Sequence, residues 1–159
     1  MQNKKYIYPS EYIVIILDQI IKFIISHNLK LYQEIKIINN FFSIYYVKNT
    51  GAAFSILENN TSFLIIVSVI FIIVLHNFIR KEEKISPKSQ ISIGLILGGV
   101  FGNLIDRIVY HSVIDYLFFF LGKHAFPVFN LADIAITVGS ALLLINLSIE
   151  QKEQIKKEK

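Results

Sequence analysis

The chain of 159 residues contains no cysteine, and only 18% of its residues are charged. The absence of cysteine excludes disulfide bonds, a thiolate nucleophile and a metal site with cysteine ligands. No internal repeat is visible, and the only low-complexity stretch is a lysine-rich tail. What the chain does have is 53% hydrophobic residues and a mean hydropathy of +0.53, which is too apolar for a soluble protein of this length and indicates membrane helices.

Long runs of isoleucine, leucine, valine and phenylalanine predict four transmembrane helices in one membrane-embedded domain, 1–159. The run at 61–79 has 19 residues and no charge, so as a helix it would extend roughly 28 Å, close to the hydrocarbon thickness of a bilayer. FFSIYYV at 41–47 is rich in aromatic and β-branched residues and predicts a strand. We therefore expect an all-α integral membrane protein with a small extracytoplasmic β-containing loop region. The predicted helices are about 10–27, 61–79, 89–107 and 131–149.

The first apolar run, at 12–25, raises the alternative of a cleaved secretory signal peptide. The residues that follow it (SHN) offer no small-x-small cleavage site, so we expect a retained helix. Asp18 and Lys22 lie within this helix at spacing i, i+4, which places them on one face where they can neutralise each other. We expect them to form a structural ion pair.

The helix predicted at 89–107 carries a row of three glycines at a spacing of four: Gly94, Gly98 and Gly102. Glycines that share one face permit a neighbouring helix to approach closely, as small residues do in membrane packing. Asp106 continues the same row, and Asn103 and Arg107 form an adjacent i, i+4 pair. The closely packed face of this helix is therefore expected to end in polar groups.

Basic residues are distributed unequally between the segments that flank the predicted helices. With the amino terminus inside, the two terminal segments and the 80–88 loop hold ten cations, whereas the outer segments hold five. Positive charge is enriched on the cytoplasmic side of membrane proteins, so the count favours an N-in, C-in orientation. The inner cations are Lys4, Lys5, Arg80, Lys81, Lys84, Lys88, Lys152, Lys156, Lys157 and Lys159, and the outer ones are Lys30, Lys36, Lys48, Arg107 and Lys123.

Polar residues, which are costly at a membrane, gather between Gly98 and Asp133. One chemistry that fits them is a pair of carboxylates sharing a proton, because two like charges a few ångströms apart do not both ionise easily. A second is a metal site that includes His111 and His124, although no HExxH-type spacing is present. A third is a proton or ion pathway through the aspartate and asparagine groups. The polar residues are Asn103, Asp106, Arg107, Asp115, Asn130 and Asp133.

Five separated motifs resemble those of the lipoprotein signal peptidases (signal peptidase II), which are membrane aspartyl proteases with four transmembrane helices. The motifs are DQIIK at 18–22, NTGAAFS at 49–55, GGVFGNLIDR at 98–107, VIDYL at 113–117 and FPVFNLADIA at 126–135. Each motif alone is weak, but five in this order and spacing are specific, and together they cover nearly the whole chain.

The resemblance implies an aspartic endopeptidase with Asp115 and Asp133 as its catalytic dyad, without a metal or other cofactor. The implied substrate is a diacylglyceryl-modified prolipoprotein, cut before its lipidated cysteine, at the extracytoplasmic face of a bacterial inner membrane. We expect membrane lipid and the substrate as partners, no nucleic acid, and a monomer. The implied substrate-binding or site-orienting residues are Asn49, Asn103, Arg107 and Asn130, and the implied structural polar residues are Asp18, Lys22 and Asp106.

Two residues near the implied dyad depart from the family pattern without removing a reacting group. Ser112 stands where glycine is common, and Ile134 stands where serine is common. Because Asp133 begins a predicted helix, whose dipole favours a charged carboxylate, we expect it to be the ionised member of the pair. The aromatic segment 114–121 is expected to lie at the lipid interface and to hold the site at that depth.

Overall fold

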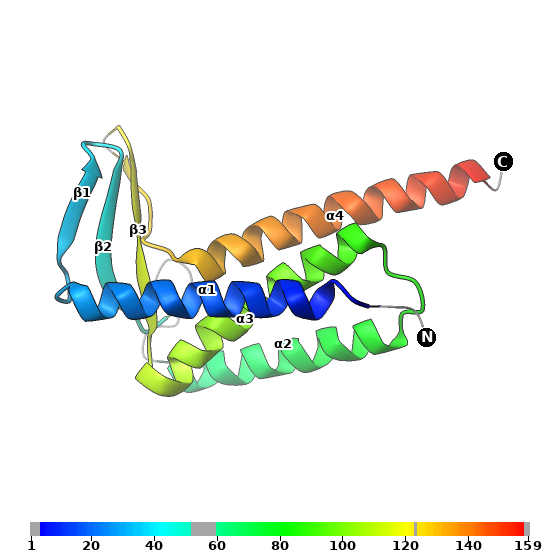
Figure 1. The fold of residues 1–159 in the computed structure, drawn as a ribbon, viewed down its shortest axis with the longest axis horizontal. Helices are drawn as coiled ribbons and strands as arrows, with labels where there is room; N and C mark the ends of the chain where they lie inside the picture. The colour runs from blue at the N-terminus through cyan, green and yellow to red at the C-terminus, as the bar shows by residue number, and fades with distance from the viewer. Residues whose placement is uncertain (1–3, 52–59, 123, 158–159) are drawn as a thin grey trace.

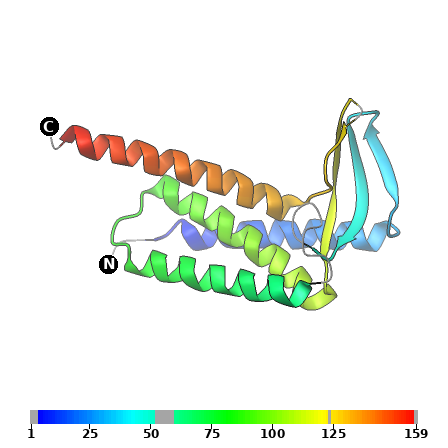
Figure 2. The same cartoon turned by 180° about the vertical axis from the view of Figure 1, so that it is seen from behind.

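The computed structural model describes residues 4–51, 60–122 and 124–157, and these residues form four helices and four strands. The helices run alongside one another, with the sheet at one end and both ends of the chain at the other (Figure 1; Figure 2). The predicted helices and the predicted β-containing region are therefore present. The elements in order are α1 (Ile7–Asn28), β1 (Glu34–Ile38), β2 (Phe42–Asn49), α2 (Thr61–Lys81), α3 (Pro87–Tyr110), β3 (Val113–Leu121), β4 (His124–Ala125) and α4 (Leu131–Lys157).

Helix α3 packs against α1 on one side and against α4 on another. A Cβ atom added to Gly98 would lie 2.7 Å from the carbonyl oxygen of Glu11 in α1, which is closer than a side chain permits. Gly94 and Gly102 meet α1 equally closely, so the predicted glycine row is confirmed as a helix-packing face. The neighbouring Gly99 lies against the first turn of α4. Glycine therefore lets two helices approach α3 at once.

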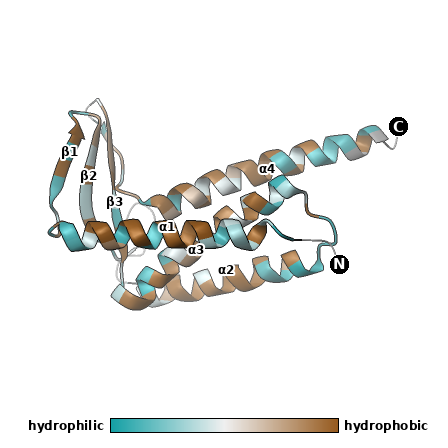
Figure 3. Ribbon diagram, in the orientation of Figure 1, coloured by the Kyte–Doolittle hydropathy of each residue, from teal (hydrophilic) through white to brown (hydrophobic). Residues whose placement is uncertain are grey.

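Within the part of the chain that the structure describes, three helices, α2, α3 and α4, are long and apolar enough to cross a membrane. Their apolar middle parts are visible in Figure 3. Helix α1 differs because it carries Glu11, Asp18 and Lys22, and all three are buried against neighbouring elements. Its exposed side is formed by large apolar residues such as Ile13 and Phe23. Helix α1 thus has a charged inner face and an apolar outer face.

The strands form one antiparallel sheet in the order β1-β2-β3-β4. Strands β2 and β3 pair with Asn49 opposite Val113, which brings the end of β2 beside the start of β3. The sheet packs on the end of α1 through a buried apolar cluster formed by Ile25, Tyr46, Ile114 and Tyr116. This cluster fixes the position of β3 relative to the helices.

The sequence prediction for the outer segments is right in part. The strand predicted at 41–47 is β2, whereas β1, whose five residues are all exposed, was not predicted. The placement of 114–121 at the lipid interface is wrong for Ile114 and Tyr116, which are only 2% and 3% exposed. The segment is a strand, in which alternate side chains point to the same face, so these two residues pack inward on α1.

The ends of α3 and α4 differ from their predicted positions. Helix α3 begins at Pro87, after Ser86, whose hydroxyl oxygen accepts a hydrogen bond from the Ser89 N–H at 3.2 Å. It ends where His111 adopts a left-handed conformation with φ of 54°. Helix α4 continues to Lys157, beyond its predicted end at 149.

Candidate active site

A cavity of about 610 Å³ lies between the sheet and the helices, and both residues of the predicted dyad line it. Asp115 comes from β3, and Asp133 comes from the first turn of α4. Asn49, Asn103 and Arg107 also line the cavity, so five of the six residues predicted to be catalytic or site-orienting share one space. The apolar part of the wall comes from Val47, Val113, Phe126, Val128, Phe129 and Ile136.

The sixth of these residues, Asn130, caps α4 together with Asp133. The Asp133 N–H donates to Asn130 Oδ1 at 2.9 Å, and the Asn130 N–H donates to Asp133 Oδ2 at 3.1 Å. This reciprocal pair satisfies backbone donors that the start of a helix leaves without intrahelical partners. The other carboxylate oxygen of Asp133 accepts a hydrogen bond from Asn103 Nδ2 at 2.8 Å. Asp133 is therefore held at both oxygens.

Asp115 is held by two amide side chains and is only 2% exposed. Asn130 Nδ2 donates to its Oδ1 at 2.7 Å, and Asn49 Nδ2 donates to its Oδ2 at 3.0 Å. Loss of hydration raises the pKa of Asp115 to about 7, and the negative charge of Asp133 acts in the same direction. The two amide donors and the positive charge of Lys22 oppose this rise in pKa. Asp115 is thus poised to carry a proton near neutral pH.

Arg107 connects the cavity to the segment that follows β2. Its guanidinium donates to the carbonyl oxygen of Gly51 at 3.2 Å and to that of Asn103 at 3.5 Å. The Gly51 N–H in turn donates to Asn49 Oδ1 at 2.9 Å. These contacts hold the first three residues of the NTGAAFS motif beside α3, and residues 52–55 of that motif lie outside the described residues.

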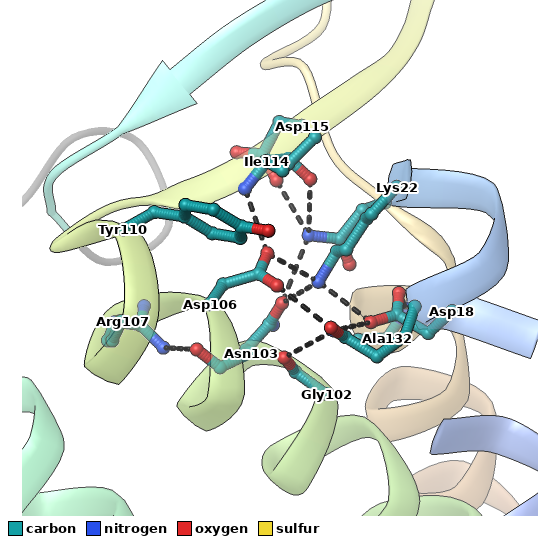
Figure 4. A network of polar contacts seen from close by, with 12 residues as sticks. Asp18, Lys22, Gly102, Asn103, Asp106, Arg107, Tyr110, Ile114, Asp115 and Ala132 are labelled. Atoms are coloured by element: carbon teal, nitrogen blue, oxygen red, sulfur yellow. Dashed lines mark hydrogen bonds and ion pairs between the residues drawn. The ribbon is translucent and has the colours of Figure 1, made fainter. Parts of the chain in front are cut away.

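The residues predicted to be structural form a buried cluster (Figure 4). Lys22 Nζ lies 2.8 Å from Asp18 and 3.0 Å from Asp106, so the predicted ion pair is confirmed and extended to a third charge. Lys22 also donates to Asn103 Oδ1 at 2.9 Å. Gln19, which the sequence analysis did not single out, donates to Asp18 at 3.3 Å and to Asp106 at 3.0 Å.

The two histidines considered as metal ligands lie away from this arrangement of carboxylates. His111 is the exposed residue that ends α3, and His124 is exposed in β4. Neither lines the cavity. Among residues 4–51, 60–122 and 124–157 there is no group of three or more histidine, aspartate or glutamate residues that could hold a metal ion.

The two departures from the family pattern also lie outside the cavity wall. Ser112 is buried, and its hydroxyl donates to the carbonyl oxygen of Tyr110 at 3.2 Å within the turn between α3 and β3. Ile134 is 37% exposed on α4.

One further contact was not predicted from the sequence. The Leu131 N–H donates to the hydroxyl of the buried Tyr116 at 3.2 Å, which joins β3 to the start of α4.

Known proteins are similar to this chain over most of its length. The chain matches the family model described as signal peptidase (SPase) II over residues 11–149. A lipoprotein signal peptidase from Symbiobacterium thermophilum is 38% identical over 141 residues, which cover 89% of this chain and 93% of that protein. A solved bacterial membrane enzyme at 2.3 Å resolution superposes with a TM-score of 0.83 at 32% identity, covering 91% of this chain and 88% of the other. A second, at 1.9 Å resolution, has a TM-score of 0.78 at 33% identity, covering 87% and 89%. This chain belongs to the signal peptidase II family.

Proposed function

We propose that this protein is an aspartic endopeptidase that removes the signal peptide from diacylglyceryl-modified prolipoproteins by cutting before the lipidated cysteine. The observation that carries the proposal is the pair of aspartates, Asp115 and Asp133, on one cavity in unlike surroundings. Burial raises the pKa of Asp115 to about 7, whereas Asp133 lies at a helix amino terminus, which favours a charged carboxylate. Unlike surroundings let two carboxyl groups divide the acid and base roles.

In this mechanism Asp133 is the base and Asp115 is the acid. Asp133 takes a proton from a water molecule, whose oxygen attacks the carbonyl carbon of the scissile peptide bond. Asp115 gives its proton to the carbonyl oxygen, so a neutral tetrahedral intermediate forms. Its collapse breaks the C–N bond; Asp133 gives a proton to the leaving nitrogen, and Asp115 regains its own.

The amide residues position these groups and the substrate. Asn130 contacts both aspartates, through Nδ2 to Asp115 and through its backbone N–H to Asp133. Asn103 and Asn49 each fix one further carboxylate oxygen. Arg107 lines the cavity and carries a positive charge there, which suits it to bind the substrate backbone through its carbonyl oxygens.

We also propose that all four helices span the membrane, with α1 as the fourth span. The charges of α1 face inward and its large apolar residues face outward, which is the arrangement that a bilayer requires. Both ends of the chain and the connection between α2 and α3 lie opposite the sheet (Figure 1). Ten basic residues belong to those three segments, which favours placing them in the cytoplasm and the cavity at the extracytoplasmic face of the bacterial inner membrane.

Cysteine labelling tests this orientation without interference, because the chain has no cysteine of its own. The substitutions Glu83→Cys and Tyr32→Cys place single thiols at exposed positions at opposite ends of the molecule. In intact cells an impermeant reagent should label the cysteine at position 32 but should reach position 83 only after the membrane is opened. The reverse pattern would put the cavity on the wrong side for an exported substrate.

The acyl chains of the substrate explain why the protease would work at a membrane surface. Each CH₂ buried in lipid contributes about 0.8 kcal/mol, so the anchor holds the scissile bond at a fixed depth. The apolar cavity wall, which includes Phe126, Val128 and Ile136, suits a lipid-bearing cysteine. Holding the bond next to the dyad removes much of the entropic cost of reaction.

The proposed function is tested with the purified protein in a bilayer of defined composition, where we expect it to act as a monomer. It is incubated with one prolipoprotein in its diacylglyceryl-modified form and, separately, in its unmodified form. We expect cleavage directly before the modified cysteine and little cleavage of the unmodified protein. No cleavage of either form would contradict the protease proposal, and equal cleavage of both would contradict the proposed requirement for lipid.

A further inference from the structure

The buried cluster of Asp18, Lys22 and Asp106 has no part in the mechanism above, although Lys22 contacts Asn103, which lines the cavity (Figure 4). Its three charged residues are at most 1% exposed. Removing charges from water is costly, and apolar replacements of buried ion pairs are frequently no less stable. Stability alone is therefore a weak reason for three charges at this position, so we considered what else the cluster holds in place.

Each carboxylate of the cluster binds the backbone directly beside one member of the dyad. Asp18 Oδ1 accepts a hydrogen bond from the Ala132 N–H at 3.0 Å, one residue before Asp133. Asp106 Oδ2 accepts one from the Ile114 N–H at 3.0 Å, one residue before Asp115. Because Lys22 holds both carboxylates, a single ammonium group joins the two backbone positions from which the dyad projects.

Lys22 also determines which way the Asn103 amide points. The oxygen of that amide accepts hydrogen bonds from Lys22 Nζ at 2.9 Å and from Asn130 Nδ2 at 3.1 Å. The amide nitrogen is thereby directed to Asp133, whose Oδ1 lies 2.8 Å away. A flipped amide would set donors against the donors of Lys22 and Asn130, and Asp133 would then face an acceptor.

We infer that Lys22 is a positioning residue for cleavage, acting through Asp18, Asp106 and Asn103 to set the placement of the two aspartates. The inference rests on the proposed function. The groups that act electrostatically on Asp115 come from several elements: Asp133 from α4, Arg107 from α3 and Lys22 from α1; Lys48 of β2 also lines the cavity. Since the charge of Lys22 lowers the pKa of Asp115, its loss should move the pH–rate profile to higher pH.

The test compares the full-length enzyme with Lys22→Met, which keeps the length of the side chain but removes its charge and its donors. We expect kcat to fall about 10- to 100-fold, the scale of loss that small misplacements of reacting groups produce, with KM changed less than about two-fold. The pH–rate profile should move upward. A merely structural residue would change the amount of folded enzyme but would change neither kcat per folded molecule nor the profile.

Two further variants separate positioning from charge and from folding. Lys22→Met combined with Asp106→Asn removes one positive and one negative charge, so the net charge of the cluster is that of the wild type. It should still lose about 10-fold in kcat, because the Asn103 amide is no longer fixed although the net charge is unchanged. Ser92→Ala changes a buried polar residue that contacts Asn146 on α4. Any effect of this substitution should be confined to the melting temperature, and kcat per folded molecule should be unchanged.

The activity of the wild-type enzyme separates failure of the positioning role from failure of the proposed function. If the wild-type enzyme does not cleave the lipid-modified prolipoprotein, the proposed function is wrong. If the wild type cleaves and both folded Lys22 variants have the wild-type kcat, the positioning role is wrong and the proposed function stands. If neither Lys22 variant yields folded protein, the cluster is a requirement of the fold and the positioning role is likewise overturned.

Discussion

The two groups of acidic residues in this protein differ in what compensates their charge. Asp18 and Asp106 lie within 3.0 Å of Lys22, and the cluster that they form is closed to solvent. Asp115 and Asp133 instead accept hydrogen bonds from neutral amides and, among the residues that the structure describes, have no ion pair. A bound cation keeps carboxylates ionised, whereas neutral donors leave a pair whose members compete for a proton. The comparison thus separates carboxylates that build a framework from carboxylates that can react.

Removal of either cavity carboxylate should have the largest effect on the cleavage rate. We expect Asp115→Asn and Asp133→Asn each to reduce cleavage by about 10³-fold or more, because an amide can neither take nor share the proton. Both variants should still fold, as judged by their melting curves. The matched control is Ser68→Ala in α2, whose hydroxyl donates to the Leu64 carbonyl of the same helix at 2.8 Å. Substantial activity in either aspartate variant would rule out this dyad.

Replacing an aspartate of the buried cluster by asparagine should instead lower the free energy of unfolding. Asp18→Asn leaves the Lys22 ammonium with one carboxylate fewer, and breaking a buried ion pair costs about 3–5 kcal/mol in the free energy of unfolding. Asp115→Asn, at a position without an ion pair, should not lower that free energy. Unfolding curves in one detergent compare the two variants. Equal losses of stability would show that the two groups do not differ as described.

The pH dependence of cleavage should report the proton on Asp115. With its pKa at about 7, Asp115 is protonated below pH 7, so the rate should fall about tenfold for each pH unit above it. The folded state binds this proton more tightly than the unfolded state does. The free energy of unfolding should therefore decline between about pH 4 and pH 7 in the wild type, and the decline should disappear in Asp115→Asn. A rate that is constant up to pH 9 would contradict the assignment.

Chelators should have the smallest effect on the cleavage rate. In the described part of the chain, Asp115 and Asp133 belong to no group of three or more histidine, aspartate or glutamate residues that could hold a metal ion. We expect EDTA to change the cleavage rate by less than about two-fold. Loss of activity with EDTA, restored by zinc, would favour the metal site that the sequence also allowed.

The sequence predicted those helices and packing faces that a pattern of neighbouring residues identifies. Long apolar runs predicted the helices, and the glycine spacing predicted which face of α3 meets α1. The residues of the site came from the motif resemblance, which places Asp115 and Asp133 without requiring any knowledge of their distance. Composition alone left the carboxylate pair, the metal site and the ion pathway open, because it does not say which polar groups meet.

What the sequence did not predict depends on contacts between distant segments. Strand β1 is exposed at all five residues and is held by its pairing with β2, not by burial in a core. The segment 114–121 is apolar or aromatic at every position except Asp115, and apolarity alone does not distinguish lipid from a protein core. The bonds from Asp18 to Ala132 and from Asp106 to Ile114 join different elements, and the first spans more than a hundred residues. No local pattern shows such pairs.

Phe126, on the wall of the cavity, gives the protein a natural position for an optical reporter. Its side chain is 49% exposed, and the chain contains no tryptophan. A tryptophan introduced there would be the only indole in the molecule, so its emission could be excited selectively against a background of tyrosine and phenylalanine. A shift in that emission on mixing would time the arrival of the acylated segment and the departure of each product, separately from bond breaking.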